Sequence, residues 1–201
     1  MEQDITSRWN RSISLRLKFV LSPKMKTELI RNINQAFLHL EFTIKLLTYM
    51  ERRTTEKDEF DTNIIITGKK RNISFNDSAF NTYDDLILGA ENCVLIAVGF
   101  SAIVLDTSLK SAGKKADPND QSSEGMLINL IYMIRCAYAH DMMHPKWKVN
   151  PNYAQPLEIQ LQNDILRLYL SKKQNQLFKI EDIGGYENYF EIKDLTCKII
   201  S

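Results

Sequence analysis

The chain has 201 residues, of which 44% are hydrophobic and 25% are charged; this composition is typical of a globular protein and excludes a wholly disordered one. Its 26 basic and 25 acidic residues leave a formal charge of +1, which excludes a global field that would draw the molecule onto nucleic acid or anionic lipid. The three cysteines are odd in number and stand among apolar neighbours, so we expect free thiols in a reduced, cytoplasmic setting.

The first quarter of the chain predicts helical structure. Residues 9–21 fit both a strand and a helix, because apolar residues recur there at both spacings, and we favour a helix. Ser22 and Pro23 then indicate a helix start, with serine as the N-cap and proline in the first turn. Apolar residues at three-four spacing continue this helix to about Arg53, so one of its faces should be buried.

Residues 54–76 are polar apart from two short apolar runs. The runs 63–67 and 73–75 flank the turn-like segment Gly68-Lys-Lys-Arg-Asn72, which predicts a small hairpin or an ordered loop. A second long helix should begin near Asn81, a good N-cap, and end near Lys110. This helix is apolar nearly all round, which in a soluble protein indicates a central helix covered on most sides.

A membrane span is the alternative for this second helix. Its uncharged part, 93–105, has only 13 residues, whereas a span needs about 20. Acidic residues flank it at Asp84, Asp85 and Asp106, and they supply no basic signal for insertion. We therefore expect a buried core helix and no membrane contact.

The second half of the chain predicts one more helix and then a change of period. A loop-like stretch at 111–123 precedes a third helix over about 123–139, and Pro145 prevents any continuation of it. Two runs of alternating leucine and isoleucine at 157–161 and 166–170 then predict a β-hairpin. Residues 186–200 follow two glycines and should form a closing helix. We thus predict a mainly α fold, with a helical domain over 1–148 and a small C-terminal β-hairpin and closing helix, 149–201, packed on it.

The unusual polar chemistry lies between Asn129 and Trp147, at the end of the third helix. There Arg135 is followed, after four residues, by His140. This motif, at the end of a helix that follows other long helices, resembles the signature of the HEPN family. The resemblance covers about residues 23–147, and the hairpin extension is not part of it. It implies a HEPN-like helical bundle and metal-independent RNA cleavage, with Arg135 on the phosphate and His140 in proton transfer.

General chemistry agrees with these implied roles. A guanidinium is always charged and presents a planar fork of donors to phosphate oxygens, and an imidazole exchanges protons near neutral pH. Neither role needs a metal or another cofactor, and we expect none. The chain departs from many catalytic members at Cys136 and Met142, where those members carry polar residues. Binding or support roles are expected for a further set: Glu91, Asn92, Asn129, Asp141, His144 and Lys146.

The spacing of the motif also predicts a homodimer. On an ideal helix five residues turn Arg135 and His140 about 140° apart, so the two side chains cannot share one face. Either the helix ends near Ala139 and His140 turns back, or the side chains meet those of a second copy across a two-fold interface. The family's sites usually form where two subunits meet. We therefore expect a homodimer that acts on RNA, with any other protein partner unknown.

Two other interpretations of the same residues stay open. In the first, the protein is a non-catalytic interaction module: Arg135 pairs with a buried carboxylate, with Glu91 and Asn92 as its expected partners, and His140 caps the helix. In the second, His140 and His144 have the spacing of a zinc metalloprotease motif, although aspartate stands where glutamate acts as base. Pro145 and the lack of an evident third ligand count against zinc.

Overall fold

The computed structural model describes residues 21–53, 56–68, 72–75, 79–162 and 164–201. This part of the chain is mostly helical, with five α-helices and two small antiparallel hairpins. The prediction of a mainly α protein is therefore confirmed at this level. The helix expected over 9–21 lies outside the described residues.

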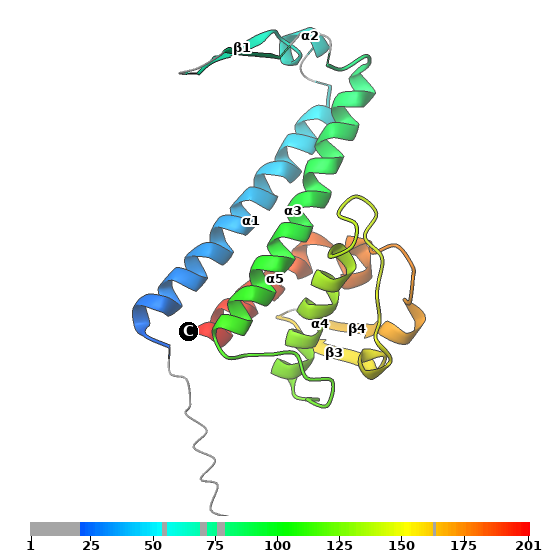
Figure 1. Cartoon of the computed structure of the whole chain (residues 1–201). Helices are drawn as coiled ribbons and strands as arrows, with labels where there is room; N and C mark the ends of the chain where they lie inside the picture. Colours follow the sequence, from blue (N-terminus) through cyan, green and yellow to red (C-terminus); the bar gives the residue numbers. More distant parts are fainter. Residues whose placement is uncertain (1–20, 54–55, 69–71, 76–78, 163) are drawn as a thin grey trace, which may run out of the picture.

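Two long antiparallel helices, α1 (Pro23–Glu51) and α3 (Tyr83–Ser111), run side by side along the molecule (Figure 1). α1 begins as predicted, because the Ser22 hydroxyl accepts the backbone N–H of Met25 and proline occupies the first turn. α3 begins one residue later than predicted. Its N-cap is Thr82, whose side chain and that of Asp85 form a capping box.

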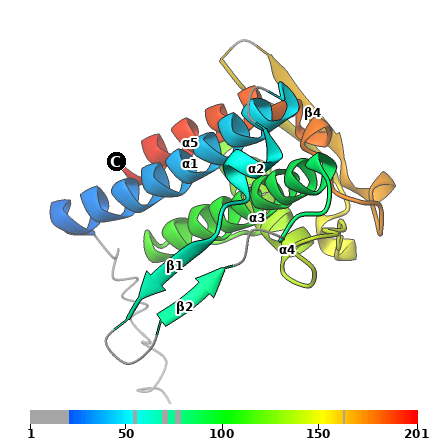
Figure 2. The same ribbon diagram turned by 90° about the horizontal axis from the view of Figure 1, so that it is seen from above.

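A small projecting unit joins these two helices. It contains the short helix α2 (Lys57–Phe60), which was not predicted, and the strands β1 (Ile64–Thr67) and β2 (Asn72–Phe75). The strands pair antiparallel with Ile64 opposite Phe75, which confirms the predicted hairpin. Both strands are exposed along their whole length, and the hairpin extends away from the ends of α1 and α3 (Figures 1 and 2).

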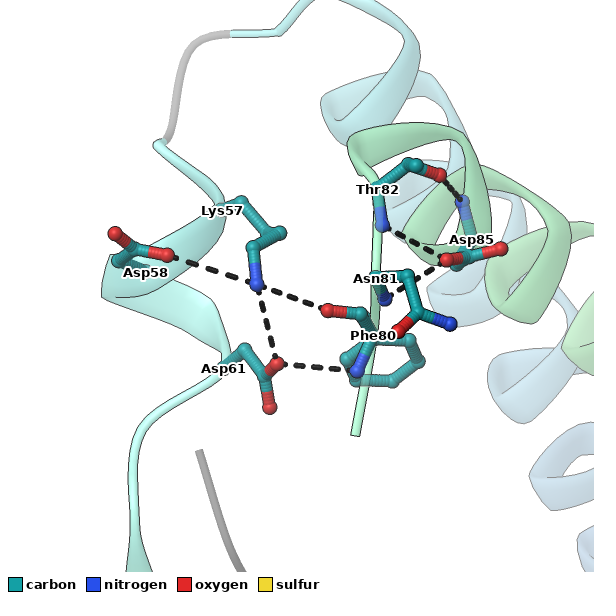
Figure 3. A network of polar contacts seen from close by, with 7 residues as sticks. All are labelled: Lys57, Asp58, Asp61, Phe80, Asn81, Thr82 and Asp85. Carbon is teal, nitrogen blue, oxygen red and sulfur yellow. Dashed lines mark hydrogen bonds and ion pairs between the residues drawn. The ribbon is translucent and has the colours of Figure 1, made fainter. Parts of the chain in front are cut away.

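A network of polar contacts fixes the root of this unit to the start of α3 (Figure 3). The buried Asp61 carboxylate accepts the backbone N–H of Phe80 at 3.1 Å, and Lys57 donates to the Phe80 carbonyl at 2.9 Å. Asp85 accepts the N–H groups of Asn81 and Thr82 in the next turn. These bonds join the segment before the hairpin to the segment after it, and they hold both at the start of α3.

The C-terminal half packs against α3 and α1. It contains α4 (Ser123–Tyr138), β3 (Pro156–Gln160), β4 (Ile165–Tyr169) and α5 (Gly185–Ile200), with three short 3-10 helices at Pro151–Tyr153, Leu170–Lys172 and Ile180–Ile183. The third helix, the second hairpin and the closing helix are thus confirmed. Burial alternates along β3 and β4 as their period of two predicts, because one face lies on the helices.

One continuous hydrophobic core joins both halves of the chain. It includes residues of α1, α3, α4, the β3–β4 hairpin and α5. At its centre the buried Tyr189 hydroxyl of α5 lies 2.9 Å from Ser101 of α3. By length and composition alone, α3 is also the one helix among the described residues that could cross a membrane, yet it contacts α1, α4 and α5.

Candidate functional site

The two motif residues lie on either side of the end of α4. Arg135 is in the last turn, with 40% of its side chain exposed. The helix ends at Tyr138, where the N–H of Ala139 donates to the Cys136 carbonyl, and His140 is exposed just beyond it. Solvent therefore reaches both side chains, as contact with a phosphate group requires.

Arg135 pairs with Asp106 of α3. The Arg135 Nε lies 3.7 Å from the Asp106 Oδ2, and the aspartate side chain is only 8% exposed. The expected pairing of Arg135 with Glu91 or Asn92 is therefore wrong. Fourteen residues separate Asn92 from Asp106, which is about 21 Å along a helix, and α4 meets α3 at the Asp106 end.

A second cation and an aromatic ring complete this cluster. The Lys110 Nζ lies 2.5 Å from the same Asp106 oxygen and 5.5 Å from the centre of the Tyr132 ring. Two cations against one carboxylate leave a net charge of +1 on the three side chains. Because Lys110 and Arg135 both remain about two-fifths exposed, this charge is available to an anion from solvent.

Tyr132 links the cluster to the rest of α4. Its pKa is raised, chiefly by a hydrogen bond with the Cys136 thiol, while the charge of Arg135 opposes the rise. Its ring also lies 5.2 Å from that of Tyr153, whose hydroxyl donates to the Ala116 carbonyl. These contacts keep a neutral phenol beside the two cations.

The chain after α4 is fixed by a close approach to α3. A Cβ atom on Gly99 would lie 2.6 Å from a Tyr138 ring carbon and 2.7 Å from the Met142 sulfur, so these two side chains would have to shift to admit it. His140 thus belongs to a short connection held on both sides against α3. Seven residues separate Gly99 from Asp106, or about 10 Å along the helix, so the two ends of the motif meet α3 two turns apart.

Asp141 shapes the turn that follows His140. Its Oδ1 accepts the backbone N–H groups of both Met143 and His144 at 2.9 Å. The bonds from His144 and then Met143 hold the Asp141 pKa below its usual value. His144 is exposed, and its Nδ1 lies 3.5 Å from the other Asp141 oxygen. This carboxylate acts as a local cap, since its partners are the next turn of the chain.

The remaining predicted residues divide between buried and exposed positions. Asn129 is buried and donates to the Asp117 carbonyl at 2.8 Å, which fixes the loop between α3 and α4. Lys146 points its side chain to solvent while its N–H donates to the Ala137 carbonyl. Glu91 is exposed on α3. Trp147, the last residue of the polar segment, is fully buried.

The zinc interpretation lacks the helical geometry that it requires. The segment from His140 to His144 follows α4 instead of forming a helix, so one helical turn does not present both imidazoles. Among the described residues, no three histidine, cysteine, aspartate or glutamate side chains gather into a group that could hold a metal ion.

Asp106, Lys110 and Tyr132 are the members of this cluster that sequence reasoning missed. A signal existed, because an acid and a base stand four residues apart at the end of an otherwise apolar helix. Together the residues around Arg135 can bind an anion, and His140 presents an exposed imidazole just beyond the end of α4. Comparisons with protein-family models, with curated proteins and with solved structures found no significant match to this chain.

Proposed function

We propose that this chain is a HEPN-like protein that binds RNA through Arg135 and cleaves it, without a metal, with the help of His140. The observation that supports it is the partly exposed cluster of Arg135 and Lys110, with an exposed imidazole, His140, just after the end of the same helix, α4. Two cations over one buried carboxylate favour a phosphate, because phosphate can accept hydrogen bonds from both.

The chemistry requires only a base and a charge stabiliser. The ribose 2′-oxygen would attack the neighbouring phosphorus while His140 takes its proton, and the bond to the 5′-oxygen would break. The protonated His140 or a water molecule then gives a proton to the leaving 5′-oxygen, which leaves a 2′,3′-cyclic phosphate and a 5′-hydroxyl. Arg135 would stabilise the charge that builds up on the phosphate oxygens.

In this proposal the active form is a homodimer. Arg135 and His140 belong to opposite ends of a segment that meets α3 at two separate turns. A second copy would allow His140 of one chain to approach a phosphate bound by Arg135 of the other. The dimer also supplies a longer basic surface than one cluster can offer.

The test is cleavage of a labelled single-stranded RNA in excess chelator. We expect products with cyclic phosphate ends from the unaltered chain, and a loss of at least about 100-fold in rate for Arg135→Ala or His140→Ala. Arg135→Ala should also weaken binding and lower the salt dependence of the dissociation constant, whereas His140→Ala should leave binding nearly unchanged.

Arg167→Ala serves as the matched control, because Arg167 is an exposed arginine that pairs with Glu158 on the β3–β4 hairpin. Circular dichroism and urea unfolding must show that each variant keeps its fold. Cleavage that survives both motif substitutions, or that Arg167→Ala removes equally, would contradict the proposal.

A second function is favoured by the ion pair itself. Because Arg135 already has a buried carboxylate partner, it can serve as a structural tie between α4 and α3 in a non-catalytic interaction module. This alternative predicts neither RNA binding nor cleavage, and it predicts that Arg135→Ala and Asp106→Ala each lower the free energy of unfolding. The same protein preparations therefore separate the two functions.

A further inference from the structure

The β1–β2 hairpin has one apolar face. Residues directly opposite each other in an antiparallel pair point to the same side of the sheet, and so do residues two apart on one strand. The register pairs Ile64 with Phe75 and Ile66 with Ile73, so these four side chains lie together on one side. Each of them is 46–54% exposed. We call this side the apolar hairpin face.

The opposite side of the hairpin is mostly polar. Within the two strands it carries Thr67, Asn72 and Ser74, with Ile65 as its one apolar residue. The Ser74 hydroxyl donates to the side-chain oxygen of Asn63 at 3.2 Å. The hairpin is therefore amphipathic, and a surface that covers its apolar face leaves the polar side in water.

The apolar hairpin face has no cover within the described part of the chain. None of its four side chains belongs to a hydrophobic core cluster. The hairpin projects from the ends of α1 and α3, away from the C-terminal half (Figures 1 and 2). Its root is fixed, because Asp61 and Lys57 bond to Phe80 (Figure 3). Two strands alone are marginally stable in water, so contact with a further surface would stabilise them.

The size of this face favours a lipid surface over a stable protein interface. About half of four large side chains leaves on the order of 400 Å² uncovered. One partner contributes about 800 Å² to a standard protein interface, which is twice as much. An element that lies on a membrane needs less area, because its apolar face enters only about 5–10 Å of the bilayer and basic residues add to the binding.

The charges along the hairpin select an anionic surface. Lys69, Lys70 and Arg71 stand in the sequence between the two strands, next to the last pair of the ladder. The acidic residues of α2, Asp58 and Glu59, lie at the root. Four residues of strand, about 13 Å, separate the two ends, and this exceeds the Debye length of about 10 Å at 0.1 M salt. The acidic root therefore does not cancel the attraction of the basic end for headgroup phosphates.

We infer that the apolar hairpin face docks this protein on the surface of an anionic membrane. Its four apolar side chains enter the boundary between headgroups and acyl chains, and the three cations between the strands contact the headgroup phosphates. The open backbone edges of β1 and β2 find no hydrogen-bond partners in hydrocarbon, so the hairpin lies at headgroup level and does not span the bilayer. Because a small apolar area and a basic segment are both weak signals, the contact is reversible.

This contact differs from a membrane span. The expectation of no membrane contact came from the short uncharged part of α3 and from the small net charge of the whole chain. Docking through the hairpin is local, and it leaves α3 in contact with α1, α4 and α5. It also does not rest on RNA binding or cleavage.

The test is flotation of the full chain with lipid vesicles in a density gradient, without RNA. We expect binding to phosphatidylcholine vesicles that contain about 30% phosphatidylserine, and at least about tenfold weaker binding to phosphatidylcholine alone. Higher salt should weaken the binding to anionic vesicles. Replacing Lys69, Lys70 and Arg71 together by alanine should raise the dissociation constant for anionic vesicles on the order of 100-fold.

Two neighbouring isoleucines provide the matched comparison. Ile66→Ser removes one side chain of the apolar hairpin face and should raise the dissociation constant about tenfold. Ile65→Ser is the control, because Ile65 is the adjacent residue of the same strand, is at least as exposed, and points to the other side. It should change the dissociation constant by less than about twofold. Both substitutions lower strand propensity equally, so the comparison separates docking from a weakened hairpin.

A chain that floats with neither kind of vesicle would overturn the inference. Equal losses for Ile65→Ser and Ile66→Ser, or equal binding to neutral and anionic vesicles, would also overturn it. If the unaltered chain ignores vesicles and the triple alanine variant loses affinity for RNA, the cations serve an RNA contact instead of a membrane. None of these outcomes bears on the cleavage assay of the proposed function, so the two can fail separately.

Discussion

At the residue scale, Gly99 decides how closely α4 and its following segment approach α3. The Tyr138 ring and the Met142 sulfur occupy the space that a side chain would need. Gly99→Ala should therefore lower the free energy of unfolding by about 1–3 kcal/mol, because the neighbouring groups must shift. Urea unfolding followed by circular dichroism measures this change.

Gly89, in the same helix, provides the matched comparison. The nearest atom to an added Cβ there is in the Phe80 ring at 3.9 Å, which is ordinary contact. Gly89→Ala should raise the free energy of unfolding by about 0.5–1 kcal/mol, because alanine is the better helix former. Equal effects of the two substitutions would contradict the close packing at Gly99.

Asp106 is the second residue whose role can be isolated. Asp106→Asn keeps the shape of the side chain but removes the charge that pairs with Lys110 and Arg135. We expect the free energy of unfolding to fall by about 1 kcal/mol, a low value because both cations keep access to solvent. Urea unfolding measures this change in the free energy of unfolding. Comparing low and high salt shows how much of the change is electrostatic.

The same substitution bears on the proposed function. Removing one negative charge raises the cluster from a net +1 to +2, so RNA should bind more tightly while Arg135 loses its fixed position. Fluorescence anisotropy should therefore show a lower dissociation constant for RNA, while cleavage assays should show a lower rate. RNA binding that weakens in Asp106→Asn would count against a phosphate site at Arg135.

At the element scale, the segment between α4 and α5 is tied down by Asp182. Its carboxylate accepts the Trp147 indole N–H at 2.8 Å and lies 2.6 Å from the Lys173 ammonium. Burial alone would raise the pKa of Asp182, but the hydrogen bonds from Lys173, Trp147 and Lys179 outweigh it and hold the pKa below 3.8. The charged form is thus the one that the fold stabilises.

The sign of the pH effect follows from this lowered pKa. The stabilisation that the charged Asp182 gives the fold is complete above the pKa of the unfolded chain, near 3.8. It is lost as the pH falls through the lower pKa of the folded chain. Asp182→Asn should therefore reduce stability at pH 7, and its difference from the unaltered chain should shrink towards pH 2–3. Urea unfolding at several pH values tests this, and a difference that stays constant with pH would contradict it.

At the scale of the whole molecule, the core couples both halves of the chain. The same cluster of buried residues contains Ile33 and Leu130 from the first part and Leu157, Tyr189 and Ile192 from the last. A fragment of residues 1–148 would expose the faces that this last part covers. We expect it to lose the cooperative thermal unfolding of the full chain and to bind a hydrophobic dye.

Circular dichroism melting and dye fluorescence measure that outcome. Adding the fragment 149–201 as a separate chain should restore part of the cooperative unfolding, because it supplies the missing part of the hydrophobic core. A fragment 1–148 that melts as sharply as the full chain would show that the helical part is an independent domain.

The sequence alone determined the four long helices α1, α3, α4 and α5 to within a few residues and the period-two hairpin, because these depend on neighbours within a few residues. Ser22 with Pro23 marked a true helix start, and the leucines at 157–170 alternated as the strands do. The position of Arg135 and His140 at the end of a helix was also readable in this way.

Only the tertiary structure decided what those residues meet. The partner of Arg135 is Asp106 and not Glu91, and Asn129 is buried behind the loop after α3. Leu88, Ile96 and Phe100 of α3 are exposed although the sequence predicts a helix covered on most sides. The reason is physical: hydrophobic period fixes which face of a helix is apolar, but contacts between distant segments depend on the offset and angle at which the helices pack.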